Sequence, residues 1–160
     1  CGAIADKASE KATEKIAESA TGCEDVDFDV EGGGASANCD GRQFDASATG
    51  QAALPDGWPE DLPAPDGTQI VTSGGATDGL GYLGLVPGTV DQVAADVRGT
   101  LEAAGYTIDE DASTTPTGDT VNGGSASVQA SDGTFTANVL LTTDASDQQS
   151  VSINWTLTPV

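Results

Sequence analysis

The amino-acid sequence predicts an α+β fold: an N-terminal stalk helix, then a mainly antiparallel β-sheet with one helix packed on its apolar face in a two-layer sandwich. Three observations predict this fold. Several segments alternate apolar and polar residues with period two, one segment in the second half has helical periodicity, and short turn-rich stretches separate them. A chain of 160 residues has room for one main hydrophobic core.

Residues 1–22 are predicted to form a lipidated N-terminus and a stalk helix. Residues 3–20 are rich in Ala, Glu and Lys, contain neither Gly nor Pro, and are followed by Gly22, a residue typical of helix ends. The apolar stripe on this helix is thin, since it consists of two Ile and two Ala residues. We therefore expect a solvated stalk and not a core helix.

Residues 23–53 are predicted to form a small β-hairpin region stapled by a disulfide. Val26, Phe28 and Val30 alternate with acidic residues, and a second short strand is expected at residues 43–46. Cys23 and Cys39 flank 15 residues, a spacing that suits a disulfide. Closing this loop would stabilise the hairpin by roughly 3 kcal/mol. The region is either a small subdomain or an edge ribbon against the main sheet.

Residues 54–67, LPDGWPEDLPAPDG, are predicted to form a connector without regular secondary structure. The connector contains four prolines and two Pro-Asp-Gly turns. Two interpretations of Trp58 are open: its ring offers a platform to a ligand, or it pins the connector onto the core.

Residues 68–160 are predicted to form the α+β domain. Two strands at 69–73 and 81–86 precede a helix that begins at Thr89, where Gln92 completes a capping box, and that ends before Gly105. Four strands are expected after the helix, at 106–109, 125–130, 134–143 and 150–159. In the last two of these strands, apolar and polar residues alternate strictly, which predicts that each strand has one buried face and one solvent-exposed face.

The charge of the chain excludes one class of partner. The formal net charge is -21, and after residue 20 the only cations are Arg42 and Arg98. Phosphate backbones would be repelled, so nucleic acid is not expected to bind. Most of this acidity is typical of a soluble, self-repelling surface.

No motif in the sequence predicts catalysis, a metal site or a cofactor. Gly79–Gly84 spells G-x-G-x-x-G, but Pro87 and Gly88 stand before the helix, so ordinary strand glycines are expected. Asp25, Asp27 and Asp29 depart from an EF-hand pattern, and the chain contains no His. We therefore expect a protein that is not an enzyme.

Cys1 is expected to carry lipid. If Cys23 and Cys39 form a disulfide, Cys1 is left without a cysteine partner. The chain also contains no Met, which is expected if a signal peptide has been removed. No apolar run approaches 18 residues, so attachment to a membrane would come from acyl chains such as palmitate. These features predict an extracellular lipoprotein on the outer face of the bacterial cell membrane.

The sequence resembles an uncharacterised family of actinobacterial surface lipoproteins. Four features carry this resemblance: Cys1, the stretch TGCEDVDFDV, the connector LPDGWPEDLPAPDG, and VDQVAADVRGTLEAAGYTI before polar strands. The resemblance implies a membrane-anchored location and this architecture. The segment VPGTVDQVAADVRGTLEAAGYTI is also similar to the helix of PASTA modules, which implies contact with the cell wall.

Together these observations predict a non-enzymatic protein-interaction module or an accessory subunit of a membrane complex, whose partner is another envelope protein. The alternative is a binding module for a cell-wall glycan or a small solute. That alternative would use the rings of Trp58, Tyr82 or Tyr106 on an exposed face.

Overall fold

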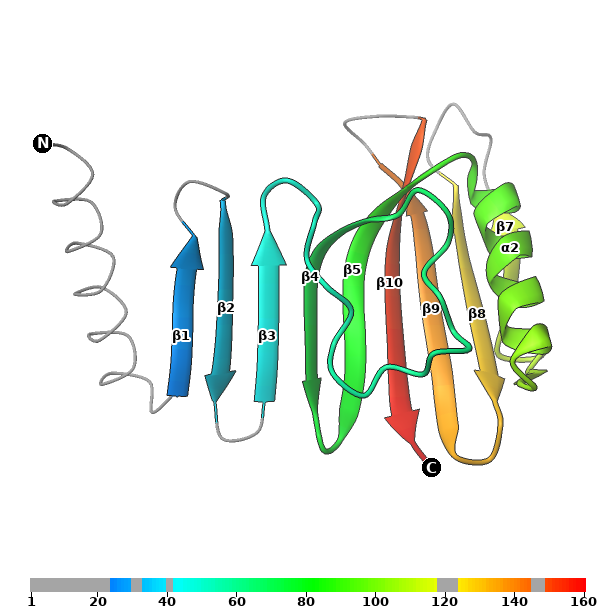
Figure 1. The fold of residues 1–160 in the computed structure, drawn as a ribbon. Coiled ribbons are helices and arrows are strands. Elements are labelled where there is room, and N and C mark those ends of the chain that lie inside the picture. Colours follow the sequence, from blue (N-terminus) through cyan, green and yellow to red (C-terminus); the bar gives the residue numbers. More distant parts are fainter. Residues whose placement is uncertain (1–23, 30–32, 40–41, 118–123, 145–148) are drawn as a thin grey trace, which may run out of the picture.

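The computed structural model describes residues 24–29, 33–39, 42–117, 124–144 and 149–160. Within these ranges the chain forms one large antiparallel sheet with a helix packed against it (Figure 1), which confirms the predicted α+β class. The predicted stalk helix, Cys1 and Cys23 lie outside the described residues.

The sheet has ten strands, which pair out of sequence order in its centre. Its strands are β1 (Glu24–Asp29), β2 (Gly34–Cys39), β3 (Arg42–Ser47), β4 (Gln69–Ala76), β5 (Gly79–Pro87), β6 (Thr107–Ile108), β7 (Thr114–Thr117), β8 (Ser125–Ser131), β9 (Phe135–Thr143) and β10 (Ser150–Pro159). The spatial order is β1-β2-β3-β4-β5-β10-β9-β8-β6, and β7 pairs with β8. The strand β10 therefore lies between β5 and β9 (Figure 1).

Two strands were not predicted from the sequence. Residues 34–39 form β2, because a run of small residues pairs with β1 on one side and β3 on the other. Residues 114–117 form β7 beside β8, although Pro116 breaks the strand pattern. The ribbon β1–β3 continues the sheet, since β3 pairs directly with β4.

The helix α2 (Val90–Ala103) forms where its capping box predicts. The Thr89 hydroxyl accepts a hydrogen bond from the backbone N–H of Gln92, whose side chain accepts one from the Thr89 N–H. The buried face of α2 packs against β6, β8 and β9. That face consists of Val90, Val93, Ala94, Val97 and Leu101.

The predicted connector crosses the same side of the sheet as an extended segment. Figure 1 shows it passing in front of β4, β5, β10 and β9. Leu62, in the connector, is fully buried and belongs to the same hydrophobic core as Ile153 and Leu157 of β10. One face of the sheet is thus covered by α2 and by the connector, which we call the covered face. The opposite side is the open face.

Candidate binding surface

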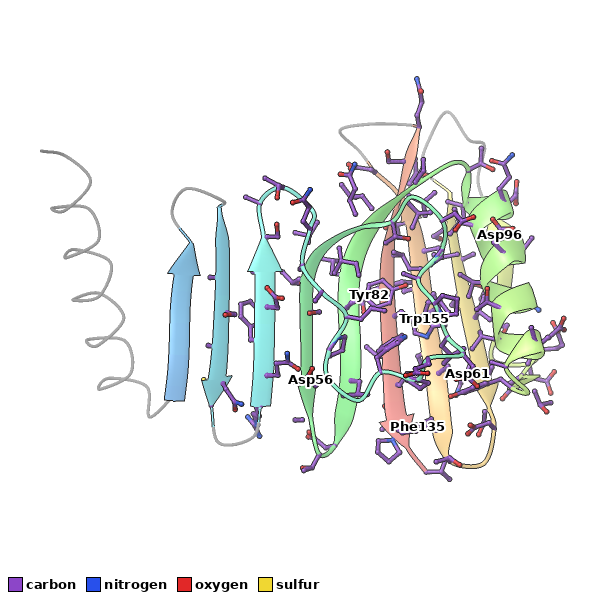
Figure 2. The ribbon with its side chains drawn as sticks, viewed as in Figure 1. Asp56, Asp61, Tyr82, Asp96, Phe135 and Trp155 are labelled. Atoms are coloured by element: carbon purple, nitrogen blue, oxygen red, sulfur yellow. The ribbon has the colours of Figure 1, made fainter. Side chains whose placement is uncertain are left out.

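The rings that were assigned to an exposed face lie in the core. Trp58 is 9% exposed, Tyr82 is 3% exposed and Tyr106 is 5% exposed. Strand register places Tyr82 beside Trp155 of β10 on the covered face, where Figure 2 shows both rings under the connector. The three residues are therefore not available as the exposed ligand platform that the sequence suggested.

Trp58 instead pins the connector to the sheet. Its ring packs edge-on against the rings of Tyr82 and Trp155, with centroids 5.3 Å and 5.9 Å away. Its indole Nε1–H donates a hydrogen bond to the Leu62 carbonyl oxygen at 2.7 Å. The second interpretation of this residue, a pin between connector and core, is confirmed.

Tyr82 and Tyr106 are held in their protonated forms. Burial raises the pKa of the Tyr82 hydroxyl well above its ordinary range. Burial also raises the pKa of Tyr106 to about 12, together with the nearby carboxylates of Asp132 and Asp61. Asp132 lies in the turn between β8 and β9, so the Tyr106 hydroxyl faces the carboxylate of this turn.

The remaining sequence motifs have structural roles or fall outside the described residues. Gly79–Gly84 lies within β5 and does not precede a helix directly. This confirms the prediction that its glycines are ordinary strand glycines. Cys39 is disulfide-bonded, and its predicted pairing with Cys23 stays a prediction because Cys23 is not described. Among the described residues, no three His, Cys, Asp or Glu side chains gather as metal ligands.

Over the strands β4 to β10 the open face has no charged strand residue, although the protein is strongly acidic. None of the strands from β4 to β10 contains Asp, Glu, Lys or Arg. Their alternating pattern places Ser, Thr, Asn, Gln, Gly and Leu on the open face, because the apolar half of each strand faces the covered side. The described carboxylates lie instead in loops, in the connector, in α2, and on the strands β1 and β3.

Exposed leucines stand in the middle of this polar face. Leu83 of β5 and Leu140 of β9 both pair with Asn154 of β10, so the three residues form one row across the sheet. Leu140 is 53% exposed and Leu83 is 38% exposed. Phe44 of β3, 48% exposed, pairs with Gly74, which places it on the same face.

Two shallow hollows lie on the open face and meet at Thr156. The first has a volume of about 610 Å³ and spans β3, β4, β5 and β10, with Arg42, Gly74, Gly81 and Thr156 among its lining residues. The second, of about 430 Å³, spans β8, β9 and β10. Its lining includes Ser127, Gln129, Asn138, Leu140, Asn154 and Thr156. Over β4 to β10 the open face is thus a hydroxyl- and amide-rich surface that is grooved near its centre.

Comparisons with known proteins identify no relative of this chain. No family model matches the chain, and neither a curated protein nor a solved structure is significantly similar to it. In the part of the chain that the structure describes, no helix is long and apolar enough to cross a membrane.

Sequence reasoning missed the open face as a site, although one signal for it was visible. The polar positions of the last strand are Ser152, Asn154, Thr156 and Thr158, none of them charged. In a chain of net charge -21, an ordinary solvated strand face would be expected to carry some carboxylates. The absence of carboxylates from successive strands was the signal in the sequence that indicated this surface.

Proposed function

We propose that this protein is a non-enzymatic interaction module of the bacterial envelope, anchored to the outer face of the cell membrane by lipid on Cys1, and that its open face docks another envelope protein. One observation carries the proposal: over β4 to β10 the face is broad and has no charged strand residue, it exposes Leu83 and Leu140, and no described element covers it. The anchor is supported by the sequence of the N-terminal segment, which the structure does not describe.

The dimensions of the open face suit a protein partner. Five strands, β4, β5, β10, β9 and β8, span about 24 Å at 4.8 Å per strand, and eight residues of strand span about 27 Å. Their product, roughly 650 Å², approaches the value of about 800 Å² per partner in a stable protein complex. A small solute would cover only part of such a surface.

The chemistry of the face resembles the centre of an interface. Interface centres are depleted of charged residues, since a desolvated charge without a counter-charge is costly. Burying the exposed half of Leu140 contributes about 1 kcal/mol, and the surrounding hydroxyls and carboxamides can each donate and accept hydrogen bonds. Carboxylates outside the strands, such as Asp78, would favour a partner with basic residues at its rim.

The test is photo-crosslinking in the native cell envelope. A photoreactive side chain is placed at residue 140 on the open face, and a control at residue 95, an exposed position of α2. We expect one protein to be cross-linked from residue 140 in near-stoichiometric yield and not from residue 95. Leu140→Glu should abolish its co-purification in mild detergent, whereas Ala95→Glu, which adds the same charge, should preserve it.

Two outcomes of the cross-linking and co-purification experiments would contradict the proposal. Equal cross-linking from both positions, or a partner that Leu140→Glu retains, would show that the open face is not the docking surface. The anchor is tested separately by the intact mass of the native protein, which should exceed that of the peptide chain by two or more acyl chains on Cys1.

A further inference from the structure

We propose that the open face contains a groove across its strands that accepts an extended peptide segment with an uncharged middle. The inference rests on the proposed function and specifies how the partner binds. It is carried by a row of paired residues that runs at right angles to the strands.

The row begins on β3 and ends on β8. Backbone pairing aligns its six members, Phe44, Gly74, Gly81, Thr156, Asn138 and Gln129. The two hollows cover successive parts of this row and share Thr156. Five intervals of about 4.8 Å separate β3 from β8, so the row is about 24 Å long from the first strand to the last, which corresponds to about seven residues of extended chain.

Four of the six residues of β4 and β5 that line the first hollow are glycines, namely Gly74, Gly75, Gly79 and Gly81. Gly74 and Gly81 pair with each other there. A Cβ on Gly74 would lie 2.9 Å from the Gln43 carbonyl oxygen, and a Cβ on Gly81 would lie 3.1 Å from that of Trp155. A side chain at Gly74 would therefore force the adjacent strand to shift, one at Gly81 would be tightly packed, and the two glycines leave a depression that an extended chain can enter.

The second hollow offers the hydrogen-bonding groups that a peptide needs. Asn138, Asn154 and Gln129 present carboxamides, each of which can donate to a peptide carbonyl and accept from a peptide N–H. The Thr156 hydroxyl donates to the Asn138 carbonyl oxygen at 3.3 Å and can still accept a hydrogen bond. Leu83 and Leu140, one row away, provide apolar contacts for alternate side chains of the segment.

Charge sets the composition of the segment. Only Arg42 and Asp78, both at the β3–β5 end of the groove, are charged among the residues that line the hollows. A charged side chain in the middle would thus be desolvated without a counter-charge. The net charge of -21 would also repel acidic segments, so the segment is neutral in its middle and neutral or basic at its ends.

A peptide fits these observations better than a glycan. No aromatic residue lines either hollow, and Phe44 only flanks the first one. The flat apolar face that an aromatic ring would offer to a sugar is therefore missing from the groove itself.

The test uses a displayed library of random twelve-residue peptides, selected on the full 160-residue chain. We expect enriched peptides to contain about seven consecutive residues without charge and to be poor in Asp and Glu. Thr156→Arg, which places a long charged side chain where the hollows meet, should weaken their binding at least tenfold by fluorescence anisotropy. Ser152→Arg is the matched control on the same strand and face, outside both hollows, and should change binding less than twofold.

Several results would overturn the inference. Selection without enrichment, peptides that bind Thr156→Arg and wild type equally, or enrichment of acidic peptides would each contradict it. Binding of neutral oligosaccharides that Thr156→Arg abolishes, without peptide binding, would assign the groove to a glycan. A dimer in sedimentation experiments that Thr156→Arg dissociates would assign the face to a second copy.

The two proposals can fail separately. Cross-linking from residue 140 without any enriched peptide would leave the docking face in place and remove only the groove. Enriched peptides that depend on Thr156, without a cross-linked protein, would keep the groove and remove the proposed partner.

Discussion

Replacing Trp58 by alanine would remove the ring that fixes the connector to the sheet. The ring is buried between the connector and the rings of Tyr82 and Trp155. Truncating a buried aromatic residue costs about 3 to 5 kcal/mol, and the change also leaves the buried Leu62 carbonyl without the indole donor. That loss is a large fraction of the 5 to 15 kcal/mol by which a typical domain is stable.

Two further variants separate the contributions of the ring. Trp58→Phe keeps an aromatic ring against Tyr82 and removes the hydrogen bond to Leu62, so we expect it to cost about 1 to 2 kcal/mol. Glu60→Ala alters an exposed residue of the same connector and should change stability by less than about 0.5 kcal/mol.

The assay is equilibrium unfolding in urea, followed by far-ultraviolet circular dichroism. Amide hydrogen exchange should show faster exchange in the connector of Trp58→Ala than in the strands beneath it. If Trp58→Ala cost less than 1 kcal/mol and left the connector protected, the connector would not be held by this ring, and the reasoning on its role would be refuted.

Three further predictions concern backbone strain and titration. Gly105 has φ +87°, so Gly105→Ala should destabilise the protein by roughly 1 kcal/mol. Gly99 lies at an open position in α2, so Gly99→Ala should stabilise the protein by up to about 1 kcal/mol. Thermal unfolding measures both changes, and equal effects of the two variants would contradict the strain argument. The pKa of Asp132 is lowered by backbone N–H groups of its own turn, so its charge stabilises the fold above the ordinary carboxyl pKa and this contribution disappears as pH falls through the lowered value. The melting-temperature advantage of wild type over Asp132→Asn should therefore shrink as the pH falls below the ordinary carboxyl pKa, and a constant difference would contradict the assignment. Absorbance at 295 nm should show no phenolate near pH 10, because burial raises the pKa of both tyrosines and that of Tyr106 to about 12; a midpoint at 10 would show that the rings are exposed.

Apart from β7, the regular elements of residues 68–160 were predictable because their signals are local. Thr89 and Gln92 mark the start of α2, and the strict alternation in residues 150–159 identifies β10. The strand β2 was missed because Gly34–Cys39 has small residues and no apolar period. The strand β7 was missed because it contains Pro116.

The site was less predictable because it depends on strand order. An aromatic ring in a polar connector is equally compatible with binding and with packing, and only the position of β5 beside β10 shows that Trp58 packs. The row that joins Gly81, Thr156 and Asn138 requires the register between three strands, which no local pattern specifies. What the sequence did contain was the absence of charge from these strands.

The central position of β10 has a consequence for how the chain folds. A chain grows from its N-terminus, so residues 150–159 emerge after every other described strand, yet they alone join β5 to β9. Until then, the ribbon from β1 to β5 and the unit of α2 with β6 to β9 have no shared strand, and the edges of β5 and β9 are unpaired and prone to association. During synthesis, therefore, β5 and β9 can be joined into one sheet only after β10 has been made.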